Sequence, residues 1–459
     1  MRLEFLNHAS FLIETNESIL ICDIWLEGNA FDNGWALLDR SISNQEYIDY
    51  LTSLKKKIFL WYSHEHSDHL SFSFLRNLQK NRTNFTVLFQ ETADKRVFNV
   101  LKKFKIDVIE QPDGKVFLID SKLSIITWKF NLGDSFCLIL ANDFKILNTN
   151  DCVINSTTLA KDVLKKINNH SNYIDIHFTQ FGYANKVGNK EDISLRKEAA
   201  IEKLHRLKIQ TEVFKPIKLV PFASFCFFCH EENFYMNDEQ NSPMKIRHSH
   251  ILKEIQNKIS FMKPFSNINL LKKNIAFNDL EKQSIEAEDF WKKKIKSIKI
   301  TTRTNRNDSL SDLYENNSNP IKEFHSYRRK SIIILGLLPQ VLEIIRYIKP
   351  VKILIKDSNL VLKVSWLNGI KLFNASKDYD MSCTKEVAIF MFKNDYGFST
   401  ININARYQIN PNSNWDKISR FFLPQVLITN GYTFQNPLLL LKLILKFLKK
   451  RSKIIFSNK

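Results

Sequence analysis

The chain has 459 residues, of which 44% are hydrophobic and 12% aromatic, a composition that excludes a disordered protein and predicts more than one hydrophobic core. The formal charge of +19 lies entirely in the second half. Residues 1–250 hold 31 Lys+Arg and 31 Asp+Glu, whereas residues 251–459 hold 36 and 17. A neutral half beside a basic half predicts chemistry in the first and attraction to an anionic surface in the second.

Targeting signals are not evident in the sequence. Glu4 and His8 interrupt the N-terminus too early for the apolar core of a signal peptide, and no run reaches the roughly 18 apolar residues of a membrane span. Six cysteines in so long a chain do not indicate a disulfide framework. We therefore expect a cytoplasmic protein.

The first half alternates short apolar runs with turns and amphipathic stretches. Helical periodicity predicts helices at residues 71–80, 93–104 and 194–208. Because strands alternate with helices, residues 1–242 are expected to form a layered α/β domain. The predicted strands cover residues 10–14, 18–26, 57–63, 85–91, 122–130, 135–141, 144–151, 173–181 and 218–228.

The second half predicts a smaller domain. Residues 243–330 are expected to form a helical segment and a polar linker, the best linker candidate being the Asn-, Ser- and Thr-rich stretch 301–324. Strands predicted at 351–378 and 399–409 place a small α+β domain at residues 331–430. A basic amphipathic helix is expected at 431–459.

The stretch "WYSHEHSDHLS" follows the apolar run "IFLWY". His64 and His66 are two residues apart and can point toward one ion, while Asp68 and His69 follow one turn later and can reach a second. Imidazole and carboxylate ligands together suit zinc, iron or manganese. A solvated polar loop is the alternative, but so dense a set of ligand residues at the end of a strand favours a metal site.

This loop, "SHEHSDH", resembles the signature loop of the metallo-β-lactamase superfamily. The segments "KILNTNDC" and "PFASFCFFCHEENFYMND" are similar to the branch that contains CMP-N-acetylneuraminate hydroxylase and the ascorbate-6-phosphate lactonase-like proteins. The resemblance covers about residues 1–240. It implies a four-layer αββα fold, with a site for two divalent metal ions, most readily zinc and alternatively manganese or iron, at one edge of its β-sandwich.

The resemblance also implies a ligand set. His64 and His66 would bind the first ion, Asp68 and His69 the second, and Asp151 would be the bridging carboxylate, although a plain turn aspartate is equally compatible with "NTNDC". His230 would be the late histidine of the second ion. Asp23 would orient ligands, and His8 would be either a pocket-edge histidine or a structural one.

One ligand of the family pattern has no counterpart. The superfamily places a third histidine of the first ion just before the strand that here reads "SFCLIL", where this chain has "KFNLGDS". Asp134 is the nearest substitute, with Asn131 behind it. His177, in a predicted apolar strand, is a further candidate, although such a histidine is more often structural. Without this third histidine, the sequence leaves open whether the site holds one ion or two.

Paired ions would make hydroxide available from water at neutral pH and polarise the bond under attack. The expected reaction is hydrolysis of an ester, lactone, amide or phosphodiester, with Asp68 and Asp151 placing the hydroxide. The resemblance points to a sugar, nucleotide-sugar or lipid-linked substrate. Three alternatives stay open: a nuclease, a scaffold without activity, and a hydroxylase-like component. The last would need a separate electron-transfer partner, because no cysteine has a histidine two residues on, as Rieske ligation requires.

The C-terminal stretch "LLLLKLILKFLKKRSK" places five lysines on one helical face: Lys442, Lys446, Lys449, Lys450 and Lys453. Leucine, isoleucine and phenylalanine cover the rest, a pattern typical of a helix lying in an anionic membrane interface. A terminal helix packed on the second domain is an equally good interpretation. Residues 437–453 thus predict a peripheral position at the inner face of the membrane, with the oligomeric state left open.

Overall fold

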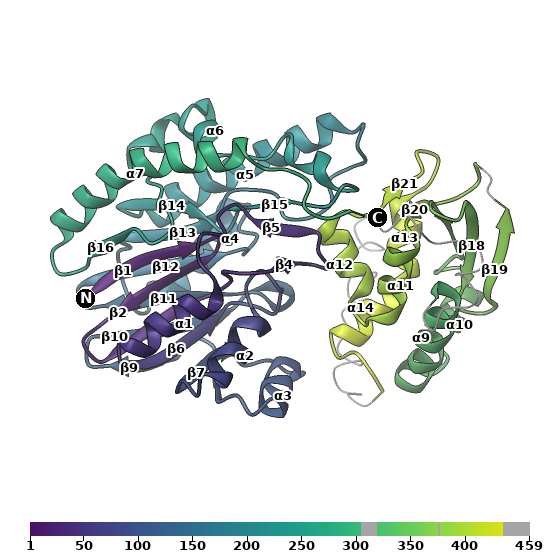
Figure 1. The fold of residues 1–459 in the computed structure, drawn as a ribbon, viewed down its shortest axis with the longest axis horizontal. Coiled ribbons are helices and arrows are strands. Elements are labelled where there is room, and N and C mark those ends of the chain that lie inside the picture. Colours follow the sequence, from purple (N-terminus) through teal and green to yellow (C-terminus); the bar gives the residue numbers. More distant parts are fainter. Residues whose placement is uncertain (304–318, 375–376, 435–459) are drawn as a thin grey trace, which may run out of the picture. The chain divides into compact units, whose positions relative to one another are not determined.

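The computed structural model describes residues 1–303, 319–374 and 377–434, which divide into two compact units (Figure 1). The first unit holds residues 1–187, 192–229 and 234–300. The second holds residues 188–191, 230–233 and the chain from Thr301 onward. Most of the expected linker and almost all of the expected basic helix at 431–459 lie outside the described residues.

Two large sheets form the centre of the first unit (Figure 1). The first sheet has the strand order β16 (Asn267–Asn269), β1 (Arg2–Asn7), β2 (Ser10–Glu14), β3 (Ser18–Cys22), β6 (Lys57–Tyr62), β7 (Phe85–Gln90) and β8 (Val108–Gln111). The second has the order β14 (Lys218–Phe222), β13 (Ile176–Gln180), β12 (Phe144–Asn150), β11 (Ser135–Ala141), β10 (Leu123–Lys129) and β9 (Val116–Asp120). A small third sheet joins β15 (Cys226–Phe228), β5 (Trp35–Leu37) and β4 (Asn29–Ala30).

Alternating side chains of each sheet belong to two different cores. In β3, Leu20 and Cys22 pack in the core between the sheets, whereas Ile19 and Ile21 pack in a core with the helices outside. This follows from the two-residue period of a strand, and it requires apolar residues on both faces. It explains why all five residues of "SILIC" are buried.

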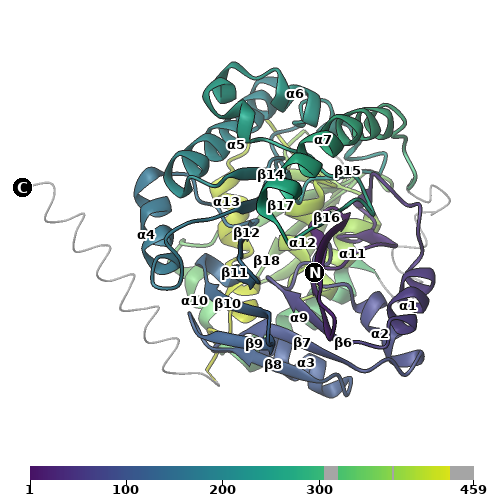
Figure 2. The ribbon, with the colours of Figure 1, turned by 90° about the vertical axis from the view of Figure 1, so that its left-hand side faces the viewer.

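Helices cover the outer face of each sheet (Figure 2). The first sheet packs against α1 (Asn44–Ser53), α2 (Phe72–Lys80) and α3 (Arg96–Lys103), through residues such as Ile48, Phe74 and Leu101. The second packs against α4 (Thr157–Ile167) and α5 (Ile193–Phe214), through residues such as Val163 and Phe214. The layers are therefore αββα, which confirms the fold expected from the sequence.

The first unit continues past residue 242, through α6 (Pro243–Arg247), the 3₁₀ helix η3 (His250–Lys258), β16 and α7 (Lys273–Lys296). Trp291 of α7 is fully buried, stacks on Phe225 with 3.9 Å between the ring centroids, and donates its indole N–H to the Met262 carbonyl. Because tryptophan buries a large apolar area, Trp291 packs α7 firmly against the two sheets. The boundary expected after residue 242 thus lies inside this unit.

The second unit is an α+β fold. Its sheet has the order β19 (Gly369–Asn374), β18 (Leu360–Ser365), β17 (Val351–Ile355), β20 (Met381–Cys383) and β21 (Gln408–Ile409). Its helices are α9 (Pro320–Leu335), α10 (Leu338–Ile344), α11 (Lys385–Lys393), α12 (Gly397–Asn404), α13 (Trp415–Phe421) and α14 (Leu423–Thr429). The strand predicted at 399–409 was wrong for most of its length, because residues 399–404 lie in α12.

Candidate metal centre

The histidine-rich loop joins β6 to α2 and is held by a tight turn. The His66 carbonyl accepts hydrogen bonds from the amides of His69 and Leu70, at 3.0 and 2.8 Å. Ser71 then caps α2 by accepting a hydrogen bond from the amide of Phe74, as serine commonly does at a helix N-terminus. This geometry leaves His66 exposed but buries Asp68 and His69 at the edge of the sheet.

The other polar residues of the site follow the ends of parallel strands. β3 pairs in parallel with β6, so Asp23, just past β3, lies beside the start of the histidine loop. β12 pairs in parallel with β13, which brings together Asp151, just past β12, and Gln180, the last residue of β13. Ligand sites commonly form at the carboxyl ends of parallel strands.

The backbone adopts a left-handed conformation at the ends of β1, β3 and β12, and none of the three residues there is a glycine. His8, Asp23 and Asn150 have φ angles of 34°, 44° and 45°. A side chain in this region clashes with its own backbone, so such residues persist where the surrounding structure holds them. The turns aim His8, Asp23 and the residue after Asn150 into the space between the strand ends.

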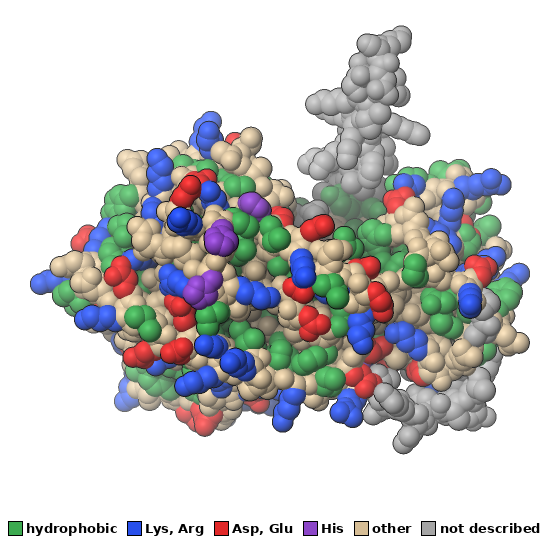
Figure 3. Space-filling view, turned by 90° about the horizontal axis from the view of Figure 1, so that it is seen from above, with side chains coloured by type: hydrophobic (Ala, Val, Ile, Leu, Met, Phe, Trp, Pro, Cys, Tyr) green, Lys and Arg blue, Asp and Glu red, His purple; other side chains and the backbone are tan. Residues whose placement is uncertain are grey.

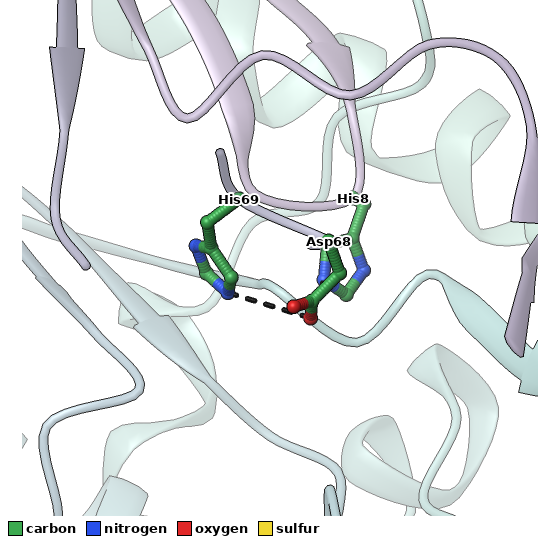
Figure 4. Close-up of side chains that lie close together, drawn as sticks. All are labelled: His8, Asp68 and His69. Carbon is green, nitrogen blue, oxygen red and sulfur yellow. Dashed lines mark ion pairs between the residues drawn. The ribbon is translucent and has the colours of Figure 1, made fainter. Parts of the chain in front are cut away.

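The first group of possible ligands is His8, Asp68 and His69 (Figure 4). The Asp68 Oδ2 atom lies 3.3 Å from His8 Nε2 and 3.5 Å from His69 Nε2. Figure 4 shows the three side chains converging from two segments, His8 from the β1–β2 turn and the other two from the histidine loop. All three are buried.

The second group is His64, His69 and Asp151. His69 Nε2 lies 3.5 Å from Asp151 Oδ2, and the rings of His64 and His69 have centroids 4.3 Å apart. His69 therefore belongs to both groups. Burial, followed by the neighbouring His69 and His66, lowers the pKa of His64 well below its usual value. His64 is thus neutral and has a lone pair to offer a metal ion.

Carboxylates dominate the electrostatics of the site. Burial by itself lowers the pKa of His69, but three surrounding carboxylates raise it well above its usual value: Asp68, Asp151 and Asp23. Burial likewise raises the pKa of Asp68 and of Asp151, but the charge of His69 lowers both below their usual values. Asp68 and Asp151 are therefore ionised, and the site is a region of negative charge that a cation would neutralise.

Asp23 positions two of the loop residues. Its Oδ1 accepts the Ser63 amide at 2.8 Å, its Oδ2 accepts the Ser63 hydroxyl at 2.9 Å, and Oδ2 also lies 3.1 Å from His69 Nδ1. With Nδ1 facing a carboxylate, His69 presents Nε2 to the two ligand groups. Metal-binding histidines are commonly oriented in this way by a carboxylate on the other ring nitrogen.

Several buried atoms of the site have no hydrogen-bond partner among the described residues. They include His8 Nδ1 and Asp68 Oδ1, whereas His8 Nε2 and His69 Nε2 each lie 3.3–3.5 Å from a carboxylate oxygen of Asp68 or Asp151. Buried polar atoms without partners are costly and call for an explanation. Imidazole nitrogens and carboxylate oxygens are ligands of zinc, iron and manganese, so the residues present fit a divalent transition-metal ion.

The remaining predicted ligands differ in position. Exposed His66 has Nδ1 2.8 Å from His64 Nε2. Burial, followed by repulsion from Asp151, raises the pKa of Asp134 to about 7, so this half-buried carboxyl lies close enough to Asp151 to interact. Neither residue belongs to a ligand group in the described part of the chain. Their ligand roles stay predictions.

His230 and His177 lie outside both groups. The structure assigns His230 to the second unit, where its backbone pairs with Thr302 and its Nδ1 lies 3.6 Å from Glu232 Oε2. Its role as a ligand of the second ion also stays a prediction. His177 is buried in β13 with Nε2 2.9 Å from the Thr149 hydroxyl, and burial lowers its pKa to about 3. This is the structural histidine that the sequence allowed as an alternative.

Sequence reasoning missed a relay behind Asp151. Gln180 donates from Nε2 to Asp151 Oδ1 at 2.8 Å, and its Oε1 accepts a hydrogen bond from the buried Lys203 ammonium. Because an ammonium group only donates, Lys203 fixes the amide so that its NH₂ faces Asp151. Both residues lie in ordinary strand and helix sequence, without a motif that marks them.

Replacing Gln180 with leucine is expected to lower metal affinity about tenfold, because loss of a residue that orients a ligand typically costs about 10–100-fold. Metal titration of the purified protein measures this. Gln256→Leu is the matched control, since its amide donates to the Ile246 carbonyl instead and its loss removes one hydrogen bond of the same kind. Equal affinities for the two variants would contradict the role of Gln180.

A cavity of about 180 Å³ lies in the first unit beside this site. Its walls include Trp35, Phe181 and Phe225, with Gln240 and Asn241 among the polar groups. Cys226 also lines it, and burial, followed by the charges of Asp68 and Asp151, raises the pKa of that thiol well above its usual value. Cys226 therefore lies within electrostatic range of two candidate ligands, although, among the described residues, no candidate ligand itself lines the cavity, whose walls combine aromatic, aliphatic and amide side chains.

Solved structures with a weak overall likeness to this chain include one that is named as a metallo-β-lactamase fold protein. They include a variant of the CmlA β-hydroxylase (TM-score 0.39, 14% identity, 59% of this chain and 54% of the other). YhfI from Bacillus subtilis has TM-score 0.37 and 9% identity, over 58% and 98% of the chains. Zn²⁺-bound PqqB from Methylobacterium extorquens has TM-score 0.35 and 11% identity, over 59% and 100%.

Curated relatives carry a more particular name. Cytidine monophosphate-N-acetylneuraminic acid hydroxylase of Cricetulus griseus is 28% identical over 159 residues, which are 33% of this chain and 27% of the relative. The enzyme of Danio rerio is 29% identical over 156 residues, 33% of this chain and 25% of the relative. The chain thus matches about a quarter of the length of these relatives. No family profile matches it.

Proposed function

We propose that this protein is a metal-dependent hydrolase that cleaves an ester, lactone, amide or phosphodiester bond. The observation that carries the proposal is the convergence of two ligand groups on His69, at the carboxyl ends of the strands. Unpartnered buried nitrogen and oxygen atoms in the same place support it. A purely structural cluster would be expected to satisfy these atoms within the protein.

Each residue of the site has a proposed role. One divalent ion would be held by His8, Asp68 and His69 or by His64, His69 and Asp151, zinc first and manganese or iron as alternatives. Because His69 Nε2 has a single lone pair, a second ion would rely on the other ligands of the remaining group. When bound, the ions would supply Lewis acidity and lower the pKa of water toward neutrality. The carboxylates of Asp68 and Asp151 accept a hydrogen bond from the attacking water and so orient it, while Asp23 keeps His69 in place.

The proposed substrate is a sugar, nucleotide-sugar or lipid-linked intermediate. Aromatic residues of the cavity walls such as Trp35 and Phe227 suit packing against a sugar ring or an acyl chain, whereas Phe225 is already stacked on Trp291. Amide side chains such as Gln240 and Asn241 can hydrogen bond to hydroxyl groups of a sugar.

A panel of lactones, phosphodiesters and acylated sugars tests the proposal, using the full chain loaded separately with Zn²⁺, Mn²⁺ and Fe²⁺. Hydrolysis of at least one class is expected, and Asp68→Asn should lower its rate by at least about 100-fold, the effect typical of a group that acts directly on the attacking water. Exposed Asp162→Asn is the matched control. Wild-type rates in the Asp68 variant would overturn the assignment, and metal-free protein after loading would overturn the proposal itself.

A hydroxylase component is the second candidate, because the curated relatives are named as hydroxylases. Such a reaction inserts one oxygen atom of O₂ into a C–H bond and reduces the other to water, so it consumes two electrons from a reductant. Product mass distinguishes the candidates: a gain of one oxygen atom that requires O₂ and a reduced electron-transfer protein supports hydroxylation. Addition of water across a cleaved bond supports hydrolysis.

Nucleic acid is a less favoured substrate. Figure 3 shows one face of the first unit, on which Lys and Arg side chains are interspersed with Asp and Glu rather than gathered in a continuous track. Proteins that bind single strands combine such a basic track with exposed aromatic residues. Binding of RNA or DNA that weakens steeply as salt increases would support the nuclease alternative again.

The proposed partner is an anionic membrane surface, reached through residues 437–453, which lie outside the described residues. Among the helices that the structure describes, none combines the length and the hydropathy needed to cross a bilayer. The proposed position is therefore peripheral, at the inner face of the membrane. Oligomeric state is left open.

A further inference from the structure

Helix α10 of the second unit packs with its polar side inward. Its buried residues are Pro339, Gln340 and Glu343, and the Glu343 carboxylate accepts hydrogen bonds from the Ser365 hydroxyl and the Trp366 amide. A surface helix of a globular protein normally buries its apolar stripe and exposes its polar side. In α10 this arrangement is reversed, so the apolar side faces outward.

The outward side continues a stripe that begins at the end of α9. Its members lie at the end of α9, in the turn at Gly336 that separates the two helices, and in and just after α10, where Val341 and Ile344 have the three-residue spacing of one helical face. They are large aliphatic side chains with exposed fractions of 79% for Ile333, 63% for Leu337, 47% for Val341, 62% for Ile344 and 64% for Ile345. Single exposed apolar residues are ordinary, but a contiguous run of this kind marks an interaction surface.

The stripe is surrounded by positive charge. Arg329 and Lys330 precede it, Arg346 and Lys349 follow it, and all four are exposed. The one acidic residue between positions 325 and 350 is Glu343, which is turned inward. Across residues 319–434 the sequence holds 16 Lys+Arg and 8 Asp+Glu. An apolar surface with a basic rim complements a layer of apolar chains beneath anionic headgroups.

The stripe also adjoins the point where the chain enters its basic, leucine-rich end. The Phe434 amide donates to the Ile334 carbonyl at 3.2 Å, and a Cβ added at Gly336 would lie 2.8 Å from the Phe434 ring. Residue 437 follows three positions later. In the sequence, the segment expected to bind a membrane therefore begins three residues after one that contacts α9 and the Gly336 turn.

We propose that this stripe, Ile333 to Ile345 with its basic rim, is a contact surface for an anionic lipid bilayer. The aliphatic side chains enter the interface between headgroups and acyl chains, and Arg329, Arg346 and Lys349 bind lipid phosphates, whereas the Lys330 ammonium is paired with Asp395 at 2.7 Å. This surface consists of described residues alone, and the proposal is independent of the metal site. This contact and the one expected of residues 437–453 would together hold the protein more firmly than either alone.

Co-sedimentation with vesicles tests the proposal, using the full chain and vesicles of phosphatidylcholine with or without phosphatidylglycerol. The wild type is expected to bind the anionic vesicles. The double substitution Ile344→Asp and Ile345→Asp should weaken that binding at least about tenfold, because it removes two inserted side chains. Both residues are exposed, so the variant should fold, which circular dichroism checks.

Two further variants complete the design. Arg346→Glu with Lys349→Glu should weaken binding to anionic vesicles about tenfold or more, and less so at high salt. Ile285→Asp in α7 is the matched control, because Ile285 lies in the first unit and its side chain is 71% exposed. This variant should bind vesicles as the wild type does. Hydrolysis of a water-soluble substrate, read in parallel, should be unchanged in all three variants.

Three results would overturn the proposal. Unchanged vesicle binding in the stripe variants would leave residues 437–453 as the whole membrane contact. Failure of the wild type to bind anionic vesicles would exclude a bilayer. A change from dimer to monomer in the Ile344 and Ile345 variant, measured by light scattering without lipid, would assign the stripe to a second copy of this chain instead.

Discussion

Replacing His69 with alanine is expected to remove metal from the protein, with affinity lowered by more than about 100-fold. The reason is that His69 Nε2 belongs to both ligand groups, so its loss leaves each with two ligands. Loss of a residue that only orients a ligand typically lowers metal affinity about 10–100-fold, and loss of a ligand common to both groups should lower it further. Metal per chain, measured by mass spectrometry of protein purified without a histidine tag, is the readout.

His177→Ala is the control for this variant. His177 is equally buried in the same unit, but it lies outside both ligand groups, so its loss should destabilise the fold without changing metal content. His66→Ala gives a graded comparison, because His66 touches His64 but belongs to neither group. Full metal content in the His69 variant would rule out the site described here.

Arg406→Ala is expected to lower the free energy of unfolding of the second unit by about 3–5 kcal/mol, the usual cost of removing one partner of a buried ion pair. The Arg406 side chain is fully buried, with Nε 3.1 Å from Glu232 Oε2 and Nη2 3.3 Å from Glu386 Oε2. Without the guanidinium, Glu232 stays buried with an uncompensated charge. Hydrogen exchange of β17 and β20 peptides measures the loss within this unit.

Arg420→Ala is the matched control for Arg406. Its guanidinium pairs with Asp416 at 2.7 Å on the exposed side of α13, where such pairs contribute about 0.5 kcal/mol or less. Combining Arg406→Ala with Glu232→Gln should recover part of the lost stability, because no buried charge remains. A single-variant effect as small as that of Arg420→Ala would show that the pair is not needed for folding.

The layered fold could be predicted because its strands carry apolar residues on both faces, as in "SILIC" and "IFLWY". Two local features could not. Residues 218–228 read as one strand but form β14 and β15 in different sheets, because Ala223 turns the chain with φ of 51°; no glycine marks this turn, and Pro221 lies inside β14 rather than at the turn. Residues 399–404 alternate like a strand but form α12, where Phe398 and Ile401 are buried one helical turn apart.

The site was predictable where its residues are close in sequence. The histidine loop identified His64, Asp68 and His69, because one turn brings them together. The position of Asp151 could be found only with knowledge of which strands are neighbours, because the parallel pairing of β12 with β13 places it at the strand ends, 3.5 Å from His69; its role as a bridging ligand stays a prediction. The sequence left open whether His8 lies at the edge of the pocket or has a structural role. The structure adds that the β1–β2 turn places His8 Nε2 3.3 Å from Asp68. The Gln180 amide and Lys203 could not be found, since only tertiary packing puts them behind Asp151.

The left-handed turns at His8, Asp23 and Asn150 carry a consequence for how this protein can change. A side chain in that conformation costs about 1–2 kcal/mol relative to glycine, so glycine at these positions would relax the backbone. At His8 and Asp23 that gain would remove a candidate ligand or the group that orients His69. Thermostability and activity are therefore in direct conflict at these two positions, and selection for heat resistance would first be expected to act elsewhere in the chain.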